Sequence, residues 1–518
     1  MTIQLYDTTL RDGTQREGLS LSVEDKVKIA RLLDRLGVGY IEGGWPGSNP
    51  KDAEFFQRMR DEPLRRARIA AFGSTRRAGI RCEDDGNLRA LLEAETPVVT
   101  IVGKSSTLHV DRVLETTREE NLRMIGESVA YLKRFGKEVI YDAEHFFDGY
   151  DLDPDYALST LDAAAGAGAD CLVLCDTNGG ALPDAVRERV CLVLDRLRAA
   201  VGIHPHNDAG LAVANALAAV QAGAVQVQGT INGYGERCGN LDLIPLIATL
   251  QLKLGMRVLD PEALARLTEA SLFVAEVANQ HPDPHAPYVG RSAFAHKGGL
   301  HVAAIAKVPE SYQHVDPAAV GNEMRVVVSE VSGRRNVRMR AEALGLGAVE
   351  SEAAVLQRIK ELEHQGFQFE AAEGSFEMLL RRAAPGYQAP FTLEDFTIIV
   401  EKRGGEGNRS QATVRMRVGE EWMHVAAEGD GPVNALDRAV RKALLPHFPG
   451  LADVTLVDYK VRIVDEHLGT GARSRVVIES ARGAERWSTV GCSDNIIEAS
   501  WLAMCDALEL ALLKPSRV

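Results

Sequence analysis

The sequence contains no apolar run that approaches the ~20 residues a membrane-spanning helix needs. It also lacks an excess of positive charge, because 59 basic and 73 acidic residues leave a net charge of −14. We therefore expect neither a membrane nor a nucleic-acid partner, since both attract basic proteins. The first residues lead directly into an acidic segment without a signal peptide, so we expect no export.

The cysteines show no pairing pattern. There are seven, an odd number, and none stands in CxxC spacing. They occupy positions 82, 171, 175, 191, 238, 492 and 505. Because disulfide frameworks and cysteine zinc sites need regular spacing, we interpret these residues as reduced thiols. The sequence thus predicts a cytoplasmic protein.

What the sequence does contain is an alternation of strands and helices. At 518 residues the chain is too long for one core, so we expect two or three domains. One predicted helix opens with a capping box of Ser22 and Asp25, and another with Asp153 before a proline. Eight β-rich runs recur at 3–6, 40–41, 69–72, 98–102, 138–141, 171–174, 202–204 and 225–230. Eight strand–helix units fit a (β/α)₈ TIM barrel better than an open doubly wound sheet.

Chemically active side chains follow the end of each predicted strand. They are Arg11 and Asp12, Glu42, Ser74, Lys104, Glu144, Asp176 and Thr177, His204 and His206, and Asn232 and Asn240. In a barrel all these strand ends meet on one face, where the active sites of this fold lie. Loops are polar in general, but polarity alone does not predict acids, imidazoles and an arginine at so many successive ends. The sequence therefore predicts an active site at this face.

A histidine pair ends the seventh predicted strand. His204 and His206 are two residues apart, which in an extended segment puts both imidazoles on the same face. Two neutral imidazoles are a typical half-site for a divalent metal, and we expect Asn207 and Asp208 to orient their second nitrogens. An isolated pair is more often a solvated strand end, so the prediction depends on further ligands from elsewhere in the chain.

Two proline-rich breaks divide the chain after the barrel, at 281–287 and 385–390. We therefore predict a TIM-barrel catalytic domain at 1–280, mostly helical connector subdomains at 281–388 and a C-terminal α+β domain at 389–518. The last domain has strands with hairpin turns, such as the glycine-rich turn at 404–408.

The C-terminal domain contains a weak internal repeat. Residues 429–435 lead into a predicted helix at 436–445, and residues 493–499 lead into one at 500–513. A strand-rich run precedes each copy, which is typical of a pseudo-twofold domain that binds a small effector or forms a dimer contact. The alternative is two unrelated helix starts.

Four motifs at the expected chemical positions carry a family resemblance. They are 5–15 (LYDTTLRDGTQ), 203–208 (IHPHND), 233–240 (GYGERCGN) and 295–301 (AHKGGLH). Together they resemble the acyltransferases that condense acetyl-CoA with 2-oxo acids, namely the 2-isopropylmalate, homocitrate and citramalate synthases. The resemblance extends over essentially the whole chain, and the C-terminal repeat resembles that family's amino-acid-sensing domain.

Within this family the chain is most similar to the citramalate synthases. The motifs responsible are 72–79 (FGSTRRAG), 102–105 (VGKS), 141–150 (YDAEHFFDGY) and 174–180 (LCDTNGG). The resemblance implies a metal-dependent Claisen condensation of pyruvate with acetyl-CoA, followed by thioester hydrolysis to citramalate and CoA, as in isoleucine biosynthesis.

The resemblance implies that Asp12, His204 and His206 are metal ligands, with Asn240 as a further ligand. One carboxylate, two imidazoles and an amide oxygen suit Mn²⁺, Mg²⁺ or Zn²⁺ and leave positions for a chelating 2-oxo acid. Pro205 departs from the small polar residue usual between the two histidines. Because proline has no backbone donor, we expect the strand to leave its ladder there.

Three residues are implied to bind the substrate. Arg11 cannot titrate and would point at the ketone oxygen, where negative charge grows. The alternative for Arg11 is a salt bridge to Asp12. The resemblance implies that Thr177 binds the substrate carboxylate and that Gln15 supports the same loop.

Removing a proton from the acetyl-CoA methyl group needs a positioned base. The family places a glutamate after the fifth strand, and Glu144 matches it. It also places a histidine and a tyrosine on the connector, reaching the barrel of a partner subunit, and His301 and Tyr312 match these. The resemblance thus implies a homodimer with a composite active site.

Regulation is predicted for 389–518, because this domain holds none of the proposed metal or proton-transfer residues. The resemblance implies an end-product amino acid as effector, which for a citramalate synthase is isoleucine. Asp430 and Asp494 stand at equivalent places in the repeat and could frame a small zwitterion at the two helix N-termini. Their alternative role is plain N-capping.

Three other functions remain open at this stage. The nearest keeps the chemistry with a larger substrate, as in 2-isopropylmalate or homocitrate synthase, and pocket size decides that question. A hydroxyacyl-CoA lyase on the same metal barrel is a second alternative, although such lyases generally end near the barrel. A non-catalytic amino-acid sensor is the third, and the intact metal and proton-transfer residues count against it.

Overall fold

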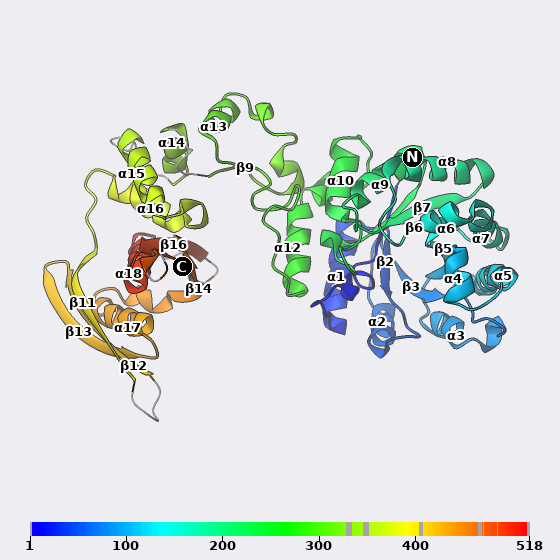
Figure 1. The fold of residues 1–518 in the computed structure, drawn as a ribbon, viewed down its shortest axis with the longest axis horizontal. Helices are drawn as coiled ribbons and strands as arrows, with labels where there is room; N and C mark the ends of the chain where they lie inside the picture. Colours follow the sequence, from blue (N-terminus) through cyan, green and yellow to red (C-terminus); the bar gives the residue numbers. More distant parts are fainter. Residues whose placement is uncertain are drawn as a thin grey trace. The chain divides into compact units, whose positions relative to one another are not determined.

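The structure, a computed structural model, describes residues 3–327, 334–344, 346, 352–402, 408–464, 469, 471–483 and 485–514. The chain forms two compact units (Figure 1). The first consists of Met1–Phe294 with Val315–Glu323, and the second of Ala295–His314 with Met324–Val518. None of the helices in the described part of the chain combines the length and apolarity that crossing a membrane requires.

Eight parallel strands close into a barrel in the first unit (Figure 1). Each pairs with the next along the chain, and the last closes the barrel by pairing with the first, where Gln226 lies opposite Gln4. The strands are β1 Gln4–Asp7, β2 Tyr40–Gly44, β3 Arg68–Ser74, β4 Val98–Lys104, β5 Glu138–Glu144, β6 Cys171–Asp176, β7 Ala200–Pro205 and β8 Gln226–Gly229. All eight predicted strands are present, so the predicted TIM barrel is confirmed.

Helices connect the strands and cover the outside of the barrel. They are α1 Val23–Leu36, α2 Pro50–Arg60, α3 Gly86–Glu93, α4 Thr107–Arg112, α5 Arg118–Arg134, α6 Phe146–Leu152, α7 Pro154–Gly166, α8 Pro183–Arg196, α9 Ala212–Ala222, α10 Leu243–Leu252, α11 Pro261–Leu264 and α12 Leu267–Val277. The predicted capping box of α1 is confirmed, because Ser22 and Asp25 each accept from the other's backbone N–H. Asp153 caps α7 by accepting from the Tyr156 backbone N–H.

The barrel interior combines apolar and polar side chains. The apolar group is Tyr6, Tyr40, Ala70, Val98, Ile140, Cys171, Val173 and Cys175. Glu42, Asp142, Gln226 and Gln228 are fully buried in the same unit. Buried polar groups are stable only when they are hydrogen-bonded, so these side chains form a network, and that network leads to the site described below.

The second unit begins with two short strands and four helices. They are β9 Ala295–His296, α13 Gly299–Ile305, β10 Arg325–Val326, α14 Arg334–Ala343, α15 Glu352–His364 and α16 Glu373–Arg382. The strands β9 and β10 pair in parallel, while a separate core lies among α14, α15 and α16. The helical character predicted for the connector is thus present.

The C-terminal part repeats one arrangement of three strands and a helix. The first copy is β11 Phe391–Lys402, β12 Asn408–Val418, β13 Glu421–Gly429 and α17 Pro432–Leu444; the second is β14 Thr455–Ile463, β15 Ser474–Arg482, β16 Glu485–Ser493 and α18 Ile496–Leu513. Each set of strands forms an antiparallel sheet in chain order, and one core joins both copies. The predicted repeat is confirmed, while the predicted turn at 404–408 lies outside the described residues except for Asn408.

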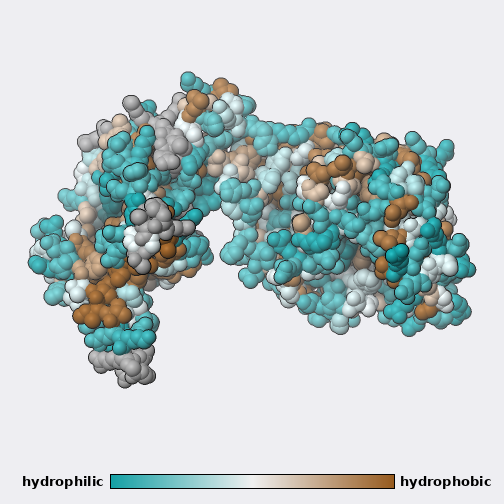
Figure 2. Space-filling model, viewed as in Figure 1, coloured by the Kyte–Doolittle hydropathy of each residue, from teal (hydrophilic) through white to brown (hydrophobic). Residues whose placement is uncertain are grey.

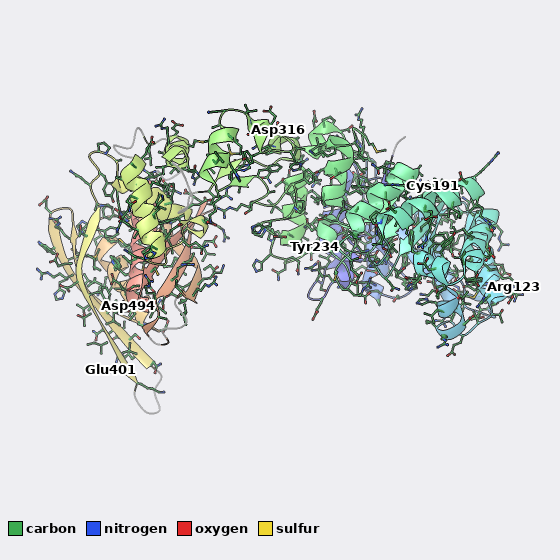
Figure 3. The ribbon with its side chains drawn as sticks, turned by 45° about the horizontal axis from the view of Figure 1, so that its top comes forward. Arg123, Cys191, Tyr234, Asp316, Glu401 and Asp494 are labelled. Carbon is green, nitrogen blue, oxygen red and sulfur yellow. The ribbon has the colours of Figure 1, made fainter. Side chains whose placement is uncertain are left out.

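The N-capping role considered for Asp430 and Asp494 is wrong. The helix α17 has Gly431 at its N-cap, and α18 has Asn495, whose side chain accepts from the Ile497 backbone N–H at 2.9 Å. The side chain of Asp430 is 95 % exposed, and Asp494 lies just before α18 (Figure 3). Both helices begin about four residues earlier than predicted, because Pro432 and Asn495 provide the start signals.

Candidate active site

The carboxyl ends of the barrel strands surround a cavity of about 350 Å³. It is lined by six of the residues to which the family resemblance gives a role, namely Arg11, Asp12, Gln15, Glu144, Thr177 and His206. His204 is buried against Asp12 and Asn240 against His204, whereas His301 and Tyr312 belong to the second unit. The strand ends therefore converge as a TIM barrel requires.

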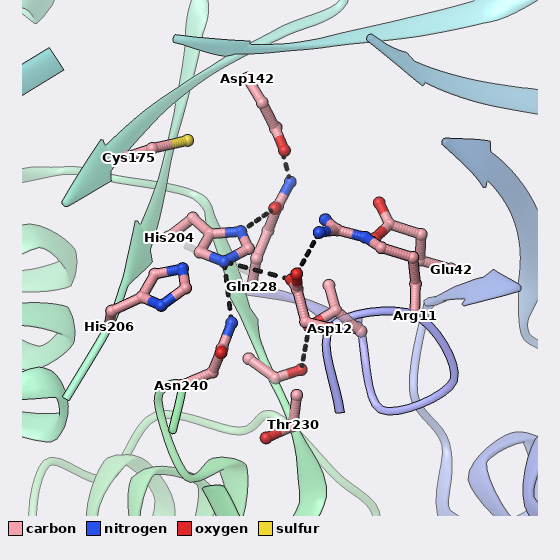
Figure 4. Close-up of polar contacts among 12 residues, drawn as sticks. Arg11, Asp12, Glu42, Asp142, Cys175, His204, His206, Gln228, Thr230 and Asn240 are labelled. Atoms are coloured by element: carbon pink, nitrogen blue, oxygen red, sulfur yellow. Dashed lines mark hydrogen bonds and ion pairs between the residues drawn. The ribbon is translucent and has the colours of Figure 1, made fainter. Parts of the chain in front are cut away.

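Four side chains from three parts of the barrel meet beside this cavity (Figure 4). His204 Nε2 lies 3.3 Å from Asp12 Oδ2 and 3.0 Å from Asn240 Nδ2. The rings of His204 and His206 stack with centroids 5.4 Å apart and planes at 18°, so the pair shares one face as predicted. All four side chains are buried.

These side chains fit a divalent cation. Asp12 Oδ2 and Asn240 Oδ1 are buried oxygens that have no hydrogen-bond partner among the described residues. Burial, followed by the charge of His204, lowers the pKa of His206 to about 4, so its imidazole is neutral. Burial raises the pKa of Asp12, but Arg11 and the histidines outweigh it, and its net pKa lies below the usual value. Neutral imidazoles, a carboxylate and an amide oxygen are the ligands of Mn²⁺, Mg²⁺ or Zn²⁺.

A second buried cluster competes for the same histidine. Single ligand atoms of Asp142, Cys175 and His204 lie within 4.8 Å of one another. Burial raises the pKa of Asp142 and of Cys175 well above their usual values, which favours their protonated forms. Metal ligands must be deprotonated, and His204 Nδ1 is already bonded to Gln228 Oε1 at 2.7 Å. The cluster around Asp12 is therefore the better cation site.

Glu42 fixes Arg11. No role was predicted for Glu42, although it ends a predicted strand. Its Oε1 accepts from Arg11 Nε at 2.6 Å, and its Oε2 accepts from the Tyr6 hydroxyl at 2.6 Å. Arg11 Nη1 also pairs with Asp12, so the salt bridge weighed from the sequence is present. The guanidinium stacks on the ring of Phe72, 3.7 Å from its centroid. Arg11 is thus held rigidly at the cavity wall.

Glu144 ends β5 and Thr177 follows the neighbouring strand β6, and both line the cavity. Lys104 Nζ pairs with Glu144 Oε2, which places a positive charge beside this carboxylate. Thr177 Oγ1 accepts from the His145 backbone N–H at 2.9 Å. His145 has a positive φ of 58°, an uncommon conformation for a non-glycine residue that positions the loop after β5.

The predicted orientation of the histidines by Asn207 and Asp208 is wrong. Asn207 Oδ1 accepts from the Ala212 backbone N–H at 3.2 Å, and Asp208 accepts twice from Arg237, each time at 2.8 Å. The partner of His204 is instead Gln228, 24 residues further on. Sequence reasoning missed it because its only signal is a polar residue at a buried strand position.

The effect expected of Pro205 is seen on one side of the strand only. Pairing of β7 with β8 ends at Ile203, whereas pairing with β6 continues to Pro205 opposite Asp176. The His206 backbone N–H then donates to the Asp176 carbonyl at 3.1 Å. Since that ladder continues past the proline, the histidine pair keeps its extended geometry.

His301 and Tyr312 lie side by side in the second unit. His301 is on α13, and Tyr312 follows a 3₁₀ turn at Pro309–Ser311. Their rings stack with centroids 4.3 Å apart and planes at 26°. Both side chains are exposed, so they form a pair that is available to a binding partner or substrate.

Comparison with known families agrees with this fold. The HMGL-like family matches residues 2–274, which covers the barrel. The homocitrate synthase post-HMGL domain-like family matches 288–366, and the LeuA allosteric (dimerisation) domain matches 370–512. A barrel of the HMGL-like family followed by these two domains defines the class of protein.

Individual relatives narrow this class. The chain is 52 % identical to an (R)-citramalate synthase of Synechocystis sp., over 99 % of this chain and 96 % of the relative. It is 50 % identical to an (R)-citramalate synthase of Geobacter sulfurreducens, over 100 % and 98 %. A probable 2-isopropylmalate synthase of Methanopyrus kandleri is 33 % identical over 96 % of each chain. The chain belongs to the (R)-citramalate synthase family.

Proposed function

We propose that this chain is an acyltransferase that condenses pyruvate with acetyl-CoA and hydrolyses the thioester, which yields citramalate and CoA. The observation that carries this proposal is the buried group of Asp12, His204, His206 and Asn240 beside a cavity that contains Arg11 and Glu144. Full-length identity of about half to two citramalate synthases supports the same reaction.

Enzymes of the HMGL-like family use a divalent metal ion. In this chain Asp12, His204, His206 and Asn240 would hold it, and their set of donors leaves Mn²⁺, Mg²⁺ and Zn²⁺ as candidates. When bound, such an ion polarises the ketone of a chelating 2-oxo acid.

Arg11 stabilises the oxyanion that forms when the ketone is attacked. Its Nε and Nη1 are held by Glu42 and Asp12, so Nη2 remains for an oxygen in the cavity. Because the guanidinium cannot lose its proton and is already fixed, it needs little reorganisation during the reaction. Thr177 and Gln15 line the same cavity. Thr177 binds the substrate carboxylate, and Gln15 supports the same loop.

Glu144 removes the proton from the acetyl-CoA methyl group. It lines the cavity, and Lys104 pairs with it from the neighbouring strand. The carbon that loses the proton then attacks the ketone carbon of pyruvate, and water finally releases CoA from the thioester. A carboxylate is a suitable general base once it is positioned and kept ionised.

His301 and Tyr312 complete the site from a partner subunit in a homodimer. This proposal rests on their stacked, exposed pair and on the match of residues 370–512 to a dimerisation domain. Apolar side chains gather over β11–β13 (Figure 2), and Ile399, Val400 and Trp422 are each more than half exposed there. A monomer rarely exposes such a group, which favours a second copy as its cover.

In this proposal the C-terminal repeat senses isoleucine. The chain has the three domains predicted at 1–280, 281–388 and 389–518, and the protein works in the cytoplasm. An inhibitor must bind two states of the enzyme unequally, typically by about 5- to 150-fold. Isoleucine added to the full-length enzyme is therefore expected to lower kcat/KM at least about fivefold. Indifference to isoleucine, leucine and lysine alike would refute the sensing role.

The decisive experiment measures CoA release from acetyl-CoA with a panel of 2-oxo acids, with and without added Mn²⁺. We expect pyruvate to exceed 2-oxoisovalerate by at least about tenfold in kcat/KM, because a pocket shaped for a methyl group excludes an isopropyl group. Comparable rates would favour a 2-isopropylmalate synthase. No metal-dependent release with any acid would favour a non-catalytic sensor.

A further inference from the structure

We propose that Gln228 is a positioning residue that fixes the tautomer of His204, so that Nε2 offers its lone pair to the cation. The inference rests on the cation site of the proposed function and adds the residue that prepares one of its ligands. Gln228 lies on β8, is fully buried, and is not among the residues that line the cavity.

The hydrogen bond between the two side chains determines which nitrogen of His204 carries the proton. His204 Nδ1 lies 2.7 Å from Gln228 Oε1. An amide oxygen only accepts, so Nδ1 must carry the hydrogen. An imidazole that binds a metal is neutral and has one such hydrogen, so Nε2 is the nitrogen left for a cation. That nitrogen faces Asp12 Oδ2 at 3.3 Å and the Asn240 amide at 3.0 Å.

Hydrogen bonds on the side of Gln228 that faces away from His204 fix the orientation of its amide group (Figure 4). Gln228 Nε2 donates to Asp142 Oδ1 at 3.1 Å and to Gln226 Oε1 at 3.4 Å. Gln226 in turn donates to Gln4 Oε1 at 3.3 Å. If the amide of Gln228 were inverted, its oxygen would face Gln226 Oε1, which only accepts, and its NH₂ group would face His204 Nδ1. Hydrogen bonds from β1, β5 and β8 therefore hold its oxygen toward the histidine.

Loss of this acceptor would leave His204 free to carry its proton on Nε2. A cation would then have to displace that proton before it could bind. Partners of this kind typically change metal affinity by about 10- to 100-fold when they are removed. The alternative is that Gln228 only fills the barrel interior. Gln226 separates the two possibilities, because it is equally buried on the same strand and meets Gln228 only at 3.4 Å, so that Asp142 Oδ1 at 3.1 Å still fixes the Gln228 amide when Gln226 is replaced.

The test compares Gln228→Met with its matched control Gln226→Met. Zn²⁺ affinity is measured without substrates, by competition with a chromophoric chelator. We expect Gln228→Met to bind at least about tenfold more weakly than the wild type, and Gln226→Met to stay within about threefold. Nitrogen NMR of ¹⁵N-histidine-labelled, metal-free protein gives a second readout. The His204 signals, assigned by their loss in His204→Gln, should show Nδ1 protonated in the wild type and Nε2 protonated in Gln228→Met.

Several outcomes would overturn the proposal. One is unchanged affinity and an unchanged NMR pattern in Gln228→Met; another is an equal loss of affinity in Gln226→Met. If Gln228→Met does not fold, Gln228→Glu restores an acceptor at the same place and should keep Nδ1 protonated and Zn²⁺ affinity within about threefold. Failure of Gln228→Glu to do so refutes the role. A wild-type protein that binds no divalent cation refutes the proposed function instead, and the NMR pattern still tests the tautomer.

Discussion

Asp12 is the residue at which the charges of the site meet. It pairs with Arg11 on one side and faces His204 Nε2 at 3.3 Å on the other. Glu42 holds the opposite edge of the same guanidinium at 2.6 Å. Because Arg11 keeps Glu42 as a partner, removing Asp12 takes one carboxylate from the cation site without leaving Arg11 unpaired.

We therefore expect Asp12→Ala and His206→Ala each to lose bound metal and nearly all activity while the fold is retained. Metal content measured by plasma mass spectrometry and circular dichroism check the two parts of this prediction. Cys175→Ala serves as the control, since it removes a member of the competing cluster, and it should keep its metal. Metal retained by Asp12→Ala and lost by Cys175→Ala would move the site to the competing cluster.

Glu144 is the second residue whose role can be isolated by one substitution. Glu144→Gln keeps the size of the side chain and its contact with the cavity but cannot accept the methyl proton. We expect kcat to fall by about 10²-fold or more while pyruvate binding, measured by calorimetry, changes little. A variant with wild-type kcat would exclude Glu144 as the base.

The loop between β8 and α10 is the element that brings Asn240 to the site. An isolated bridge joins Asn240 to His206, and the Asn240 backbone N–H donates to the Gly233 carbonyl at 3.2 Å. The loop folds so tightly that a Cβ at Gly235 would lie 2.1 Å from Asn240 Oδ1. Gly235 is therefore required by close packing against a proposed ligand.

Gly235→Ala is expected to displace the Asn240 side chain and to weaken metal binding by at least about tenfold. Chelator competition measures this, and thermal unfolding shows whether the barrel as a whole is affected. Gly180→Ala is the matched control, because a Cβ at that loop position meets nothing within 4 Å. Wild-type affinity in Gly235→Ala would mean that Asn240 is not a ligand.

Taken as a whole, the molecule separates the proposed chemistry over two compact units. Asp12 and Glu144 belong to the barrel, while His301 and Tyr312 belong to the second unit. The second unit is itself tied together across the connector, since Arg382 on α16 pairs with Asp506 on α18 at 2.7 Å. Cutting the chain near residue 389 would break this packing, so full-length variants are the better tools for regulation and assembly.

A complementation experiment tests whether the site is composite. Neither His301→Ala nor Asp12→Ala is expected to be active alone, but heterodimers of the two contain one site with all its residues intact. We expect each heterodimer to have up to about half of the activity of a wild-type dimer, since one of the two sites in the heterodimer is complete. Activity is measured on heterodimers purified with two affinity tags. Demonstrated heterodimers without activity would show that each chain builds its site alone.

Much of this molecule is determined locally, and the sequence alone predicts that part. Strand and helix periodicity produced all eight barrel strands, and Ser22 and Asp25 marked the start of α1. The face shared by His204 and His206 also follows from sequence, because successive side chains in a strand alternate between its two faces. The helix N-caps near Asp430 and Asp494 were misplaced, because a boundary depends on which of several polar residues actually makes the hydrogen bond.

Contacts between distant residues were decided only by the tertiary structure. Glu42 meets Arg11 across 31 residues, and Gln228 meets His204 across 24. Nothing local in the sequence favours Gln228 over Asn207 or Asp208, which are adjacent to the histidines and have similar hydrogen-bonding groups. The barrel decides between them because closing β8 against β1 turns Gln228 inward, while the loop after β7 turns Asp208 toward Arg237. Strand register, which is a property of the whole sheet, thus determines the partner of His204.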